Sequence, residues 1–350
     1  NPNGNFLGDA ILFHEEENNL LSVGAQAGHN WLRYNIETGD YDVEYEYQPR
    51  PAATGNDPND YRYQVQGPDA VEVMREAADD PLPDLGFFNF ETITIDGVET
   101  NLLRHGMAGE SGFEFWGPYE QREEIRSAVL EAGEDYDIRR LGAESYQTAN
   151  VILGWLPLVV PAIFSDEMAD YREWLDVRDG LLSVGGSFDS DDISDYYVTP
   201  IELGYDHIVS FDNEFVGREA LEEEIDDPAR KKVTLEWHAD DLQKVRGSLY
   251  EEGATNEYMN FPHPRNAACP YDEVLADGEH IGVSTDKSYI YNERDFISLA
   301  VIDTEYSEPG TEVTLTWGDP DDNDNKRIER HQQKEITATV ANAPYSEDNR

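Results

Sequence analysis

The sequence has 350 residues, of which 75 are Asp or Glu and 25 are Lys or Arg, so its formal net charge at pH 7 is −50. Hydrophobic residues make up 39% of the chain, which excludes wholesale disorder and supports a sizeable core. A surface this acidic repels phosphate backbones and anionic lipids, so we predict no nucleic-acid partner and no membrane partner. The length indicates two or three domains.

The acidic residues are spread along the whole chain, whereas lysine occurs only six times. This composition is typical of proteins from salt-in halophiles, because at molar salt the Debye length shrinks to about 3 Å and the self-repulsion becomes tolerable. The single cysteine, Cys269, excludes a disulfide framework and a cysteine-based zinc site, and we predict no metal site. No run of 18 apolar residues occurs, so we expect a cytoplasmic protein.

The first part of the chain carries strand and helix signals in alternation. Residues 6–13 and 20–23 are predicted to be strands, and residues 30–38 a helix. Residues 49–60, rich in Pro, Asn, Asp and Gly, are the first plausible linker. Because the turn signal of residues 1–4 leads directly into a strand, we expect the chain to begin inside a domain, as a piece of a longer product.

The middle of the chain contains a hairpin signal, the Asp96-Gly97 pair between two alternating runs. Around it, the predicted elements are a strand at 61–66, a helix at 69–77, hairpin strands at 87–95 and 98–104, and helices at 119–132 and 145–153.

Beyond Pro228 the pattern changes to short strands separated by turns, which is typical of a small β-barrel or sandwich. The tail from Asn342 is polar and is expected to be frayed. The predicted strands are 232–237, 279–285, 296–302, 312–317 and 335–340. The predicted domains are 1–60, the rear part of a split α/β domain, 61–228, a central α/β domain, and 229–350, the barrel domain.

Generic catalytic motifs are absent from the sequence. It has no P-loop, no Gly-x-Ser-x-Gly and no His-Glu-x-x-His, and its eight histidines are scattered. Cys269 precedes Pro270 and has no evident activating partner, so an inert thiol is favoured.

Several longer segments, taken in order, are more informative. Residues 105–115 (HGMAGESGFEF) resemble the Tyr-Thr-Gly-Glu-x-Gly-Tyr-Glu-Ile segment of the glycine-cleavage T-protein (aminomethyltransferase) superfamily. Residues 199–205 (TPIELGY) and 215–221 (FVGREAL) resemble its Thr-Pro-x-Glu-x-Gly and Phe-Ile-Gly-x-x-Ala-Leu segments, and residues 278–300 its barrel region. The order and spacing match over essentially all 350 residues.

Within that superfamily, the chain is most similar to the tetrahydrofolate-dependent aryl O-demethylases, which act on vanillate and syringate. The resemblance implies an α+β fold in which three domains form a cloverleaf around a central folate channel, with a C-terminal β-barrel and with the N-terminal part of the family fold missing. The similar blocks are residues 141–146, 154–157, 161–163, 171–175, 185–188 and 195–197.

The resemblance implies two catalytic residues. Tyr146 matches a tyrosine proposed as catalytic in the demethylases, where a positioned phenol can protonate or stabilise the departing aryloxide. Asp9, in the segment of residues 7–11, matches the aspartate regarded as catalytic in aminomethyltransferases, beside the folate. The alternatives are a helix-capping tyrosine with its ring in the core and an acidic residue at a strand end.

The resemblance also implies cofactor-binding residues. Glu114 matches the glutamate that binds the pterin, whose adjacent N–H donors suit two carboxylate oxygens; Glu110 is the competing choice. Trp155 and Tyr205 would stack on or wall the folate site, with a plain core role as the alternative. Met107 stands where the family has tyrosine, so one folate contact becomes apolar.

The leading hypothesis is therefore a methyltransferase of the O-demethylase type, which passes a methyl group from a methoxy-aromatic or similar small-molecule donor to N5 of tetrahydrofolate. One alternative is a glycine-cleavage aminomethyltransferase, which would dock a lipoyl carrier protein; it is weakened by Thr148, which replaces the T-protein arginine. Demethylation of a sulfonium or N-methyl donor is a further option, and another is a non-enzymatic folate-binding accessory protein. The demethylases usually carry an arginine suited to a substrate carboxylate where this chain has Ala25-Gln26, which counts against an aromatic acid donor.

Overall fold

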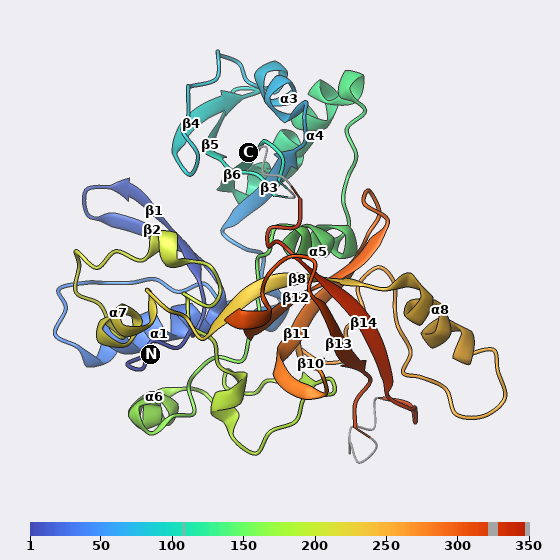
Figure 1. The fold of residues 1–350 in the computed structure, drawn as a ribbon. Helices are drawn as coiled ribbons and strands as arrows, with labels where there is room; N and C mark the ends of the chain where they lie inside the picture. Colours follow the sequence, from blue (N-terminus) through green and yellow to red (C-terminus); the bar gives the residue numbers. More distant parts are fainter. Residues whose placement is uncertain (108, 321–327, 347–350) are drawn as a thin grey trace. The chain divides into compact units, whose positions relative to one another are not determined.

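The computed structural model describes residues 1–107, 109–320 and 328–346, with residues 52 and 53 described by their backbone alone. The chain divides into two compact units (Figure 1). The first comprises Asn1–Tyr41 and Asn150–Tyr345, and the second consists mainly of Asp42–Ala149. The three-domain division, with its boundaries at residues 60 and 228, stays a prediction.

The first unit is built around a closed antiparallel barrel with the strand order β10-β11-β12-β8-β14-β13, in which β13 also pairs with β10. The barrel appears in yellow to red in Figure 1. Its strands are β8 (Arg230–Trp237), β10 (Asp272–Ala276), β11 (Glu279–Ile290), β12 (Asp295–Asp303), β13 (Glu312–Trp317) and β14 (Lys334–Ala341). The predicted C-terminal barrel is confirmed.

Alternating apolar side chains fill the interior of the barrel. Along β13 and β14 every second residue is buried, as strand geometry requires when one face meets a core. Trp237 packs against Phe296 and Trp317, with ring centroids 4.9 and 5.9 Å apart, and its indole N–H donates to Ser298 Oγ over 2.9 Å. The indole is therefore buried with its polar atom satisfied.

The start of the first unit pairs β1 (Ala10–Glu16) with β2 (Asn19–Gly24), followed by α1 (Gln26–Thr38), which ends at Gly39. The strand predicted at residues 6–13 therefore starts four residues later in the structure than predicted, at Ala10. The reason is that Phe6 is extended but hydrogen-bonds to loops: its amide donates to Val198 O and its carbonyl accepts from Ala162 N.

Shorter elements complete the first unit. The α-helices and short strands are α6 (Ala169–Trp174), β7 (Val184–Gly185), α7 (Arg218–Glu224), α8 (Ala239–Ser248) and β9 (Cys269–Pro270), and the 3-10 helices are η3 (Asp166–Met168), η4 (Ile193–Tyr196), η5 (Asp206–Ile208) and η6 (Thr304–Tyr306). Residues 347–350 of the tail expected to fray lie outside the described residues. Before them, the Tyr345 hydroxyl oxygen lies 2.8 and 2.9 Å from carboxylate oxygens of Glu236 and Asp295 and shares its one proton between them.

The second unit is a four-stranded antiparallel sheet of order β3-β6-β5-β4. One face carries the aromatic residues of the core, which pack against α3 and α4. Its elements are α2 (Pro51–Thr54), β3 (Asp60–Gln66), α3 (Ala70–Ala77), β4 (Phe90–Ile95), β5 (Val98–Arg104), β6 (Gly112–Pro118), η1 (Tyr119–Gln121), α4 (Arg122–Ala132), η2 (Glu134–Tyr136) and α5 (Ala143–Ile152), whose last turn belongs to the first unit.

The predicted hairpin is confirmed. Asp96 and Gly97 both have positive φ, 50° and 78°, which matches the turn that two-residue hairpins favour, and Ile95 pairs with Val98 across it. Sequence reasoning missed β6, whose first residues belong to the segment of residues 105–115 treated as a motif, and also β10 and α8.

Candidate functional site

Asp9 lies immediately before β1 and is partly buried in the first unit. Its carboxylate accepts a 2.7 Å hydrogen bond from the indole N–H of Trp155. Gly24 leaves room for this loop, because a Cβ there would meet the carbonyl oxygen of Asp9 at 2.5 Å. Burial raises the pKa of Asp9, and the indole hydrogen bond partly opposes that rise. The structure thus brings together Asp9 and Trp155, two of the predicted site residues.

Tyr205 joins this group. A turn that starts at Thr199-Pro200 carries it, and its amide donates to Pro200 O over 2.8 Å. Burial raises the pKa of the Tyr205 phenol, and the nearby Asp9 carboxylate raises it further, while the backbone of Leu156 opposes the rise. The phenol is therefore protonated at neutral pH. We refer to Asp9, Trp155 and Tyr205 as the Asp9 group.

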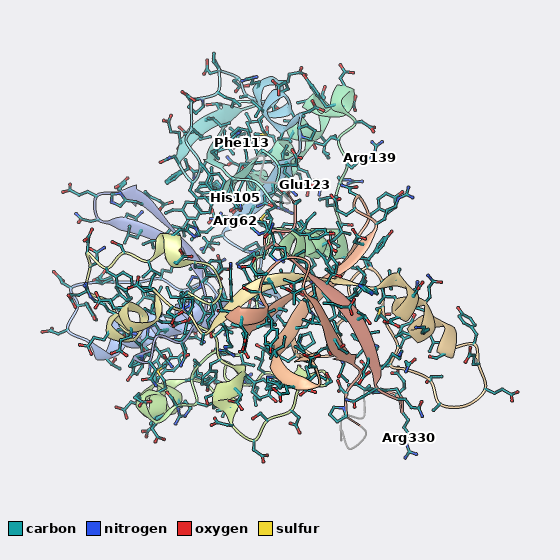
Figure 2. The ribbon with its side chains drawn as sticks, viewed as in Figure 1. Arg62, His105, Phe113, Glu123, Arg139 and Arg330 are labelled. Atoms are coloured by element: carbon teal, nitrogen blue, oxygen red, sulfur yellow. The ribbon has the colours of Figure 1, made fainter. Side chains whose placement is uncertain are left out.

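Glu114 lies on β6 in the second unit, in register with Gln64 of β3. Its side chain is 14% exposed and pairs with the guanidinium of Arg62, which also stacks on Trp116 with 4.7 Å between the guanidinium carbon and the ring centroid. Figure 2 labels Arg62 on this sheet. Gln64 Nε2 donates to Glu114 over 3.4 Å, and the buried Gln64 Oε1 meets no partner in the described part of the chain. The carboxylate is thus held on the sheet face opposite the aromatic core.

Tyr146 projects from α5, and its side chain is 38% exposed. Its surroundings raise the pKa of the phenol, mainly through partial burial and secondarily through the negative charge of Glu114. The structure therefore brings Tyr146 within electrostatic range of Glu114 and keeps it protonated at neutral pH. Met107 is buried, and its backbone amide donates over 2.7 Å to the side-chain oxygen of Gln66, which lies on β3 two residues after the Gln64 that pairs with Glu114. Glu110, the competing choice for the pterin, is also partly buried.

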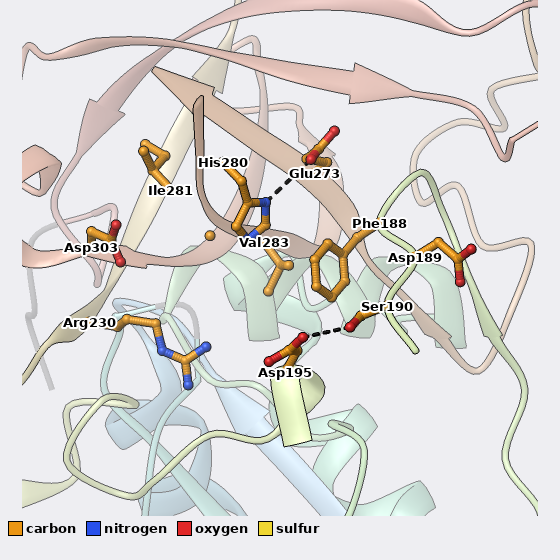
Figure 3. Close-up of a pocket in the computed structure, with 11 residues that line it drawn as sticks. Phe188, Asp189, Ser190, Asp195, Arg230, Glu273, His280, Ile281, Val283 and Asp303 are labelled. Atoms are coloured by element: carbon orange, nitrogen blue, oxygen red, sulfur yellow. Dashed lines mark hydrogen bonds and ion pairs between the residues drawn. The ribbon is translucent and has the colours of Figure 1, made fainter. Parts of the chain in front are cut away.

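A hollow of about 400 Å³ lies elsewhere in the first unit (Figure 3). Phe188 stacks on the His280 ring, and His280 Nδ1 lies 3.4 Å from a carboxylate oxygen of Glu273. The guanidinium of Arg230 faces the hollow from the opposite side, as does Asp195. None of the six predicted site residues lines this hollow.

Two other findings concern the residues that the structure describes. No group of three or more His, Cys, Asp or Glu side chains among them is arranged to hold a metal ion. None of their helices combines the length and the apolar character needed to cross a bilayer.

Comparisons with known proteins place these residues in a family. Residues 1–151 match the model of the GCVT N-terminal domain. The chain is 38% identical to syringate O-demethylase of Sphingobium sp. (strain NBRC 103272 / SYK-6) over 348 residues, which span 98% of this chain and 75% of that protein. The chain belongs to the GCVT family. The predicted resemblance is confirmed.

Other similar proteins share less of their sequence with this chain. A sesamin methylene transferase from Sinomonas sp. (strain No.22) is 30% identical over 99% of this chain and 75% of its own length. An aminomethyltransferase from Caldanaerobacter subterraneus subsp. tengcongensis is 25% identical over 90% of this chain and 68% of its own length. The crystal structure of aminomethyltransferase T from Bartonella henselae superposes with a TM-score of 0.58 at 17% identity, over 100% of this chain and 74% of that one. The fold is therefore the mixed α/β fold of that protein.

Sequence reasoning missed the residues that hold the predicted GCVT-family site residues in place. The pairing of Arg62 with Glu114 joins residues 52 positions apart. A signal existed, because Arg62 and Gln64 are the polar positions of a strand whose alternate residues are aromatic or apolar. Lys232, whose ammonium lies 4.8 Å from the centroid of the Tyr205 ring, gave no signal of its own.

Proposed function

We propose that the chain is a tetrahydrofolate-dependent methyltransferase of the O-demethylase type, which passes a methyl group from a methoxy-aromatic or similar small donor to N5 of tetrahydrofolate. The relative named syringate O-demethylase, 38% identical over nearly all of the chain, supports this substrate class. The observation that carries the proposal is the Glu114 carboxylate, 14% exposed and held by Arg62 and Gln64 beside the unpartnered Gln64 Oε1. The charge of Glu114 acts on the Tyr146 phenol, which places these two groups in the same part of the second unit. The Tyr146 phenol suits an aryl leaving oxygen, and the Glu114 carboxylate suits the N–H edge of a pterin.

The residues around Glu114 fit a reduced pterin. The carboxylate is largely buried and oriented by Arg62, and a carboxylate has lone pairs for further N–H donors beyond those it receives from Arg62 and Gln64. The buried, unpartnered Gln64 Oε1 is a second acceptor on the same face. Such an acceptor costs free energy unless a donor reaches it, so a ligand rich in N–H groups is favoured there.

Each residue has a separate role in this proposal. Bound tetrahydrofolate supplies N5 as the methyl acceptor. As the methyl–oxygen bond of the ether breaks, Tyr146 donates a hydrogen bond or a proton to the departing aryl oxygen. Glu114 orients the pterin edge, and Met107 provides an apolar wall. Asp9, held by Trp155 and close to Tyr205, positions the folate, so that alignment of donor and acceptor provides much of the rate.

We predict that Tyr146→Phe and Glu114→Gln separate chemistry from binding. Tyr146→Phe should lower kcat for methyl-tetrahydrofolate formation by about 10²–10⁴-fold because the general acid is lost, with folate affinity nearly unchanged. Glu114→Gln should weaken tetrahydrofolate binding about tenfold or more, because a charge-assisted hydrogen bond is lost. Calorimetry at high salt gives the affinities, and chromatographic product analysis gives the rates.

Matched controls are available in the same unit. Tyr136→Phe removes a phenol that bonds Glu76 on the surface, and Glu110→Gln alters the competing carboxylate. Both should leave kcat and affinity unchanged. Wild-type turnover by Tyr146→Phe would remove its acid role, and absence of any tetrahydrofolate affinity in the unaltered protein would end the whole proposal.

The second candidate is a glycine-cleavage aminomethyltransferase, favoured by relatives of that name at 24–25% identity. It would require a lipoyl carrier protein as partner, whereas the leading proposal needs only a small-molecule donor. A panel of methoxybenzoates, methylated amines and an aminomethyl-lipoyl carrier separates these classes by which one yields a folate product. Folate binding without turnover on the whole panel would favour the non-enzymatic accessory protein.

We further propose that the protein works in the cytoplasm of a halophile and that its domains take the three-domain arrangement around a folate channel that the resemblance implies. The net charge of −50 supports the first of these proposals. The fold similarity to aminomethyltransferase T supports the second.

A further inference from the structure

Lys232 is a largely buried lysine without a carboxylate partner. It lies on β8, where its amide donates to Glu202 O over 2.8 Å, and its ammonium lies above the Tyr205 ring. A Cβ built on Gly204 would meet the Lys232 nitrogen at 3.8 Å, so the ammonium rests on the turn that carries Tyr205. Within the described ranges, no Asp or Glu oxygen lies within 4.0 Å of this nitrogen.

The missing counter-ion is unexpected in this chain. It contains 75 acidic residues and six lysines, and Lys287, which is fully buried, has a partner in Asp272. Burial lowers the pKa of Lys232 to about 8, with no carboxylate to offset the cost. A buried charge is normally paired, so this ammonium is suited to an anion that the chain itself does not supply.

The anion must also suit the groups around the ammonium. Tyr205 offers a ring face beside the nitrogen, its hydroxyl end lies near Asp9, and Glu202 is already occupied by Arg230. A phosphate dianion would place two charges on one group beside Asp9, in a chain at −50, whereas each carboxylate group carries a single charge and can sit at the end of an aromatic group. The surroundings therefore favour an aromatic carboxylate.

We propose that Lys232 is a specificity-determining residue that binds a carboxylate of the ligand beside the Tyr205 ring. This inference deepens the proposed function and rests on it for the identity of the ligand. Two ligands of that reaction carry the required chemistry, namely the glutamate tail of tetrahydrofolate and an aromatic acid that donates the methyl group. The shared element is a carboxylate attached through an aromatic ring system.

The test compares ligand pairs in which one member lacks the part that bears the carboxylate. Tetrahydrofolate is compared with tetrahydropterin-benzamide lacking the glutamate, and 3,4,5-trimethoxybenzoate with 1,2,3-trimethoxybenzene, by calorimetry on the whole chain at high salt. Lys232→Met should weaken the carboxylate member of one pair by about 10–100-fold and leave its neutral counterpart unchanged. The ligand pair whose affinity changes shows whether the carboxylate that Lys232 binds belongs to tetrahydrofolate or to the methyl donor. Lys231→Met, the exposed neighbour on β8, is the matched control and should change neither.

A second readout does not depend on turnover or on folate. In protein labelled with ¹³Cε-lysine, six lysines give few signals, and the Lys232→Met spectrum assigns the resonance. Addition of trimethoxybenzoate or p-aminobenzoylglutamate should raise the titration midpoint of Lys232, because a bound anion stabilises the ammonium. The Lys231 signal should not move.

The outcomes separate the two proposals. If tetrahydrofolate binds but neither carboxylate ligand loses affinity in Lys232→Met, the assignment of Lys232 is overturned and the proposed function stands. If tetrahydrofolate does not bind while a carboxylate shifts the Lys232 midpoint, the proposed function falls and the anion site stands. If no carboxylate changes the Lys232 signal, the anion site is overturned whatever the activity.

Discussion

Asp9 and Tyr146 illustrate how burial tunes single residues in this protein. Burial raises the pKa of both, but the effect on function differs. For the phenol, a higher pKa keeps the proton in place, so that Tyr146 can donate a hydrogen bond to a departing oxygen, although it makes the phenol a weaker acid. For the carboxylate, it brings the protonated form closer to neutral pH, and the Trp155 indole counteracts this by stabilising the anion. The indole is therefore a positioning and a charge-stabilising partner.

We predict that Trp155→Phe raises the pKa of Asp9 further, because a hydrogen bond from the indole to that carboxylate is lost. If ionised Asp9 positions folate, the pH below which tetrahydrofolate affinity falls should move to a higher value in this variant. Calorimetric measurement of tetrahydrofolate affinity from pH 4 to pH 8 gives the pH below which the affinity falls.

Trp174→Phe is the control, because its indole donates over 2.8 Å to the surface residue Glu37 and not to the Asp9 group. In Trp174→Phe, the pH below which tetrahydrofolate affinity falls should match that of the unaltered protein. If the pH dependence of tetrahydrofolate affinity is unchanged in Trp155→Phe, Asp9 does not govern folate affinity.

At the scale of the elements, the barrel contains an ion pair between Lys287 of β11 and Asp272 of β10, each with a side chain 2% exposed. The carboxylate sits where burial raises its pKa and the ammonium opposes the rise. Buried pairs contribute little net stability, yet loss of one partner leaves an uncompensated charge. The pair therefore makes this part of the barrel sensitive to single substitutions.

We predict that Lys287→Met lowers the free energy of unfolding by about 3–5 kcal/mol, because Asp272 is left buried and unpaired. The double variant Lys287→Met/Asp272→Leu should recover much of this loss, since no buried charge remains. Urea unfolding at 2 M salt gives the free energies. Lys244→Met, which breaks an exposed pair with Asp241, should cost less than about 1 kcal/mol. A Lys287→Met loss as small as that would contradict the prediction.

The elements that sequence reasoning predicted are those with local signals. The Asp96-Gly97 hairpin and the alternating strands of the barrel are encoded by residues close in sequence. By contrast, β6 was hidden because its segment, residues 112–118, is nearly continuous in buried residues and follows a glycine-rich loop. A buried central strand lacks the alternation that marks a half-exposed one.

In the candidate site, too, only the features marked locally in the sequence could be predicted. Glu114, Tyr146 and Asp9 were found because a family resemblance marks them, and their assigned roles stay predictions. The partners that set their chemistry depend on register and long-range packing: Arg62 reaches Glu114 only through the pairing of β3 with β6, and Trp155 lies 146 positions from Asp9. No spacing pattern in one sequence specifies such pairs.

At the scale of the whole molecule, the charge of −50 must be borne by a folded protein with 25 basic residues. The ion pairs between side chains are mostly exposed and short in sequence separation, such as Arg126 with Glu123 and Arg218 with Glu222. Pairs of this kind contribute little each, so they do not offset the excess of negative charge. Screening by salt must supply the balance.

We predict that the free energy of unfolding rises by on the order of 2–5 kcal/mol between 0.1 and 2 M NaCl, or roughly 3–7 °C in Tm. The physical reason is that folding brings 75 acidic residues closer together, and screening reduces this repulsion more in the folded state than in the extended chain. Differential scanning calorimetry over a salt series measures the effect. NaCl and Na₂SO₄ matched for ionic strength should act alike if screening is the cause. Stabilisation by sulfate alone would instead indicate exclusion of the salt from the protein surface, and a Tm independent of NaCl would refute the role of charge.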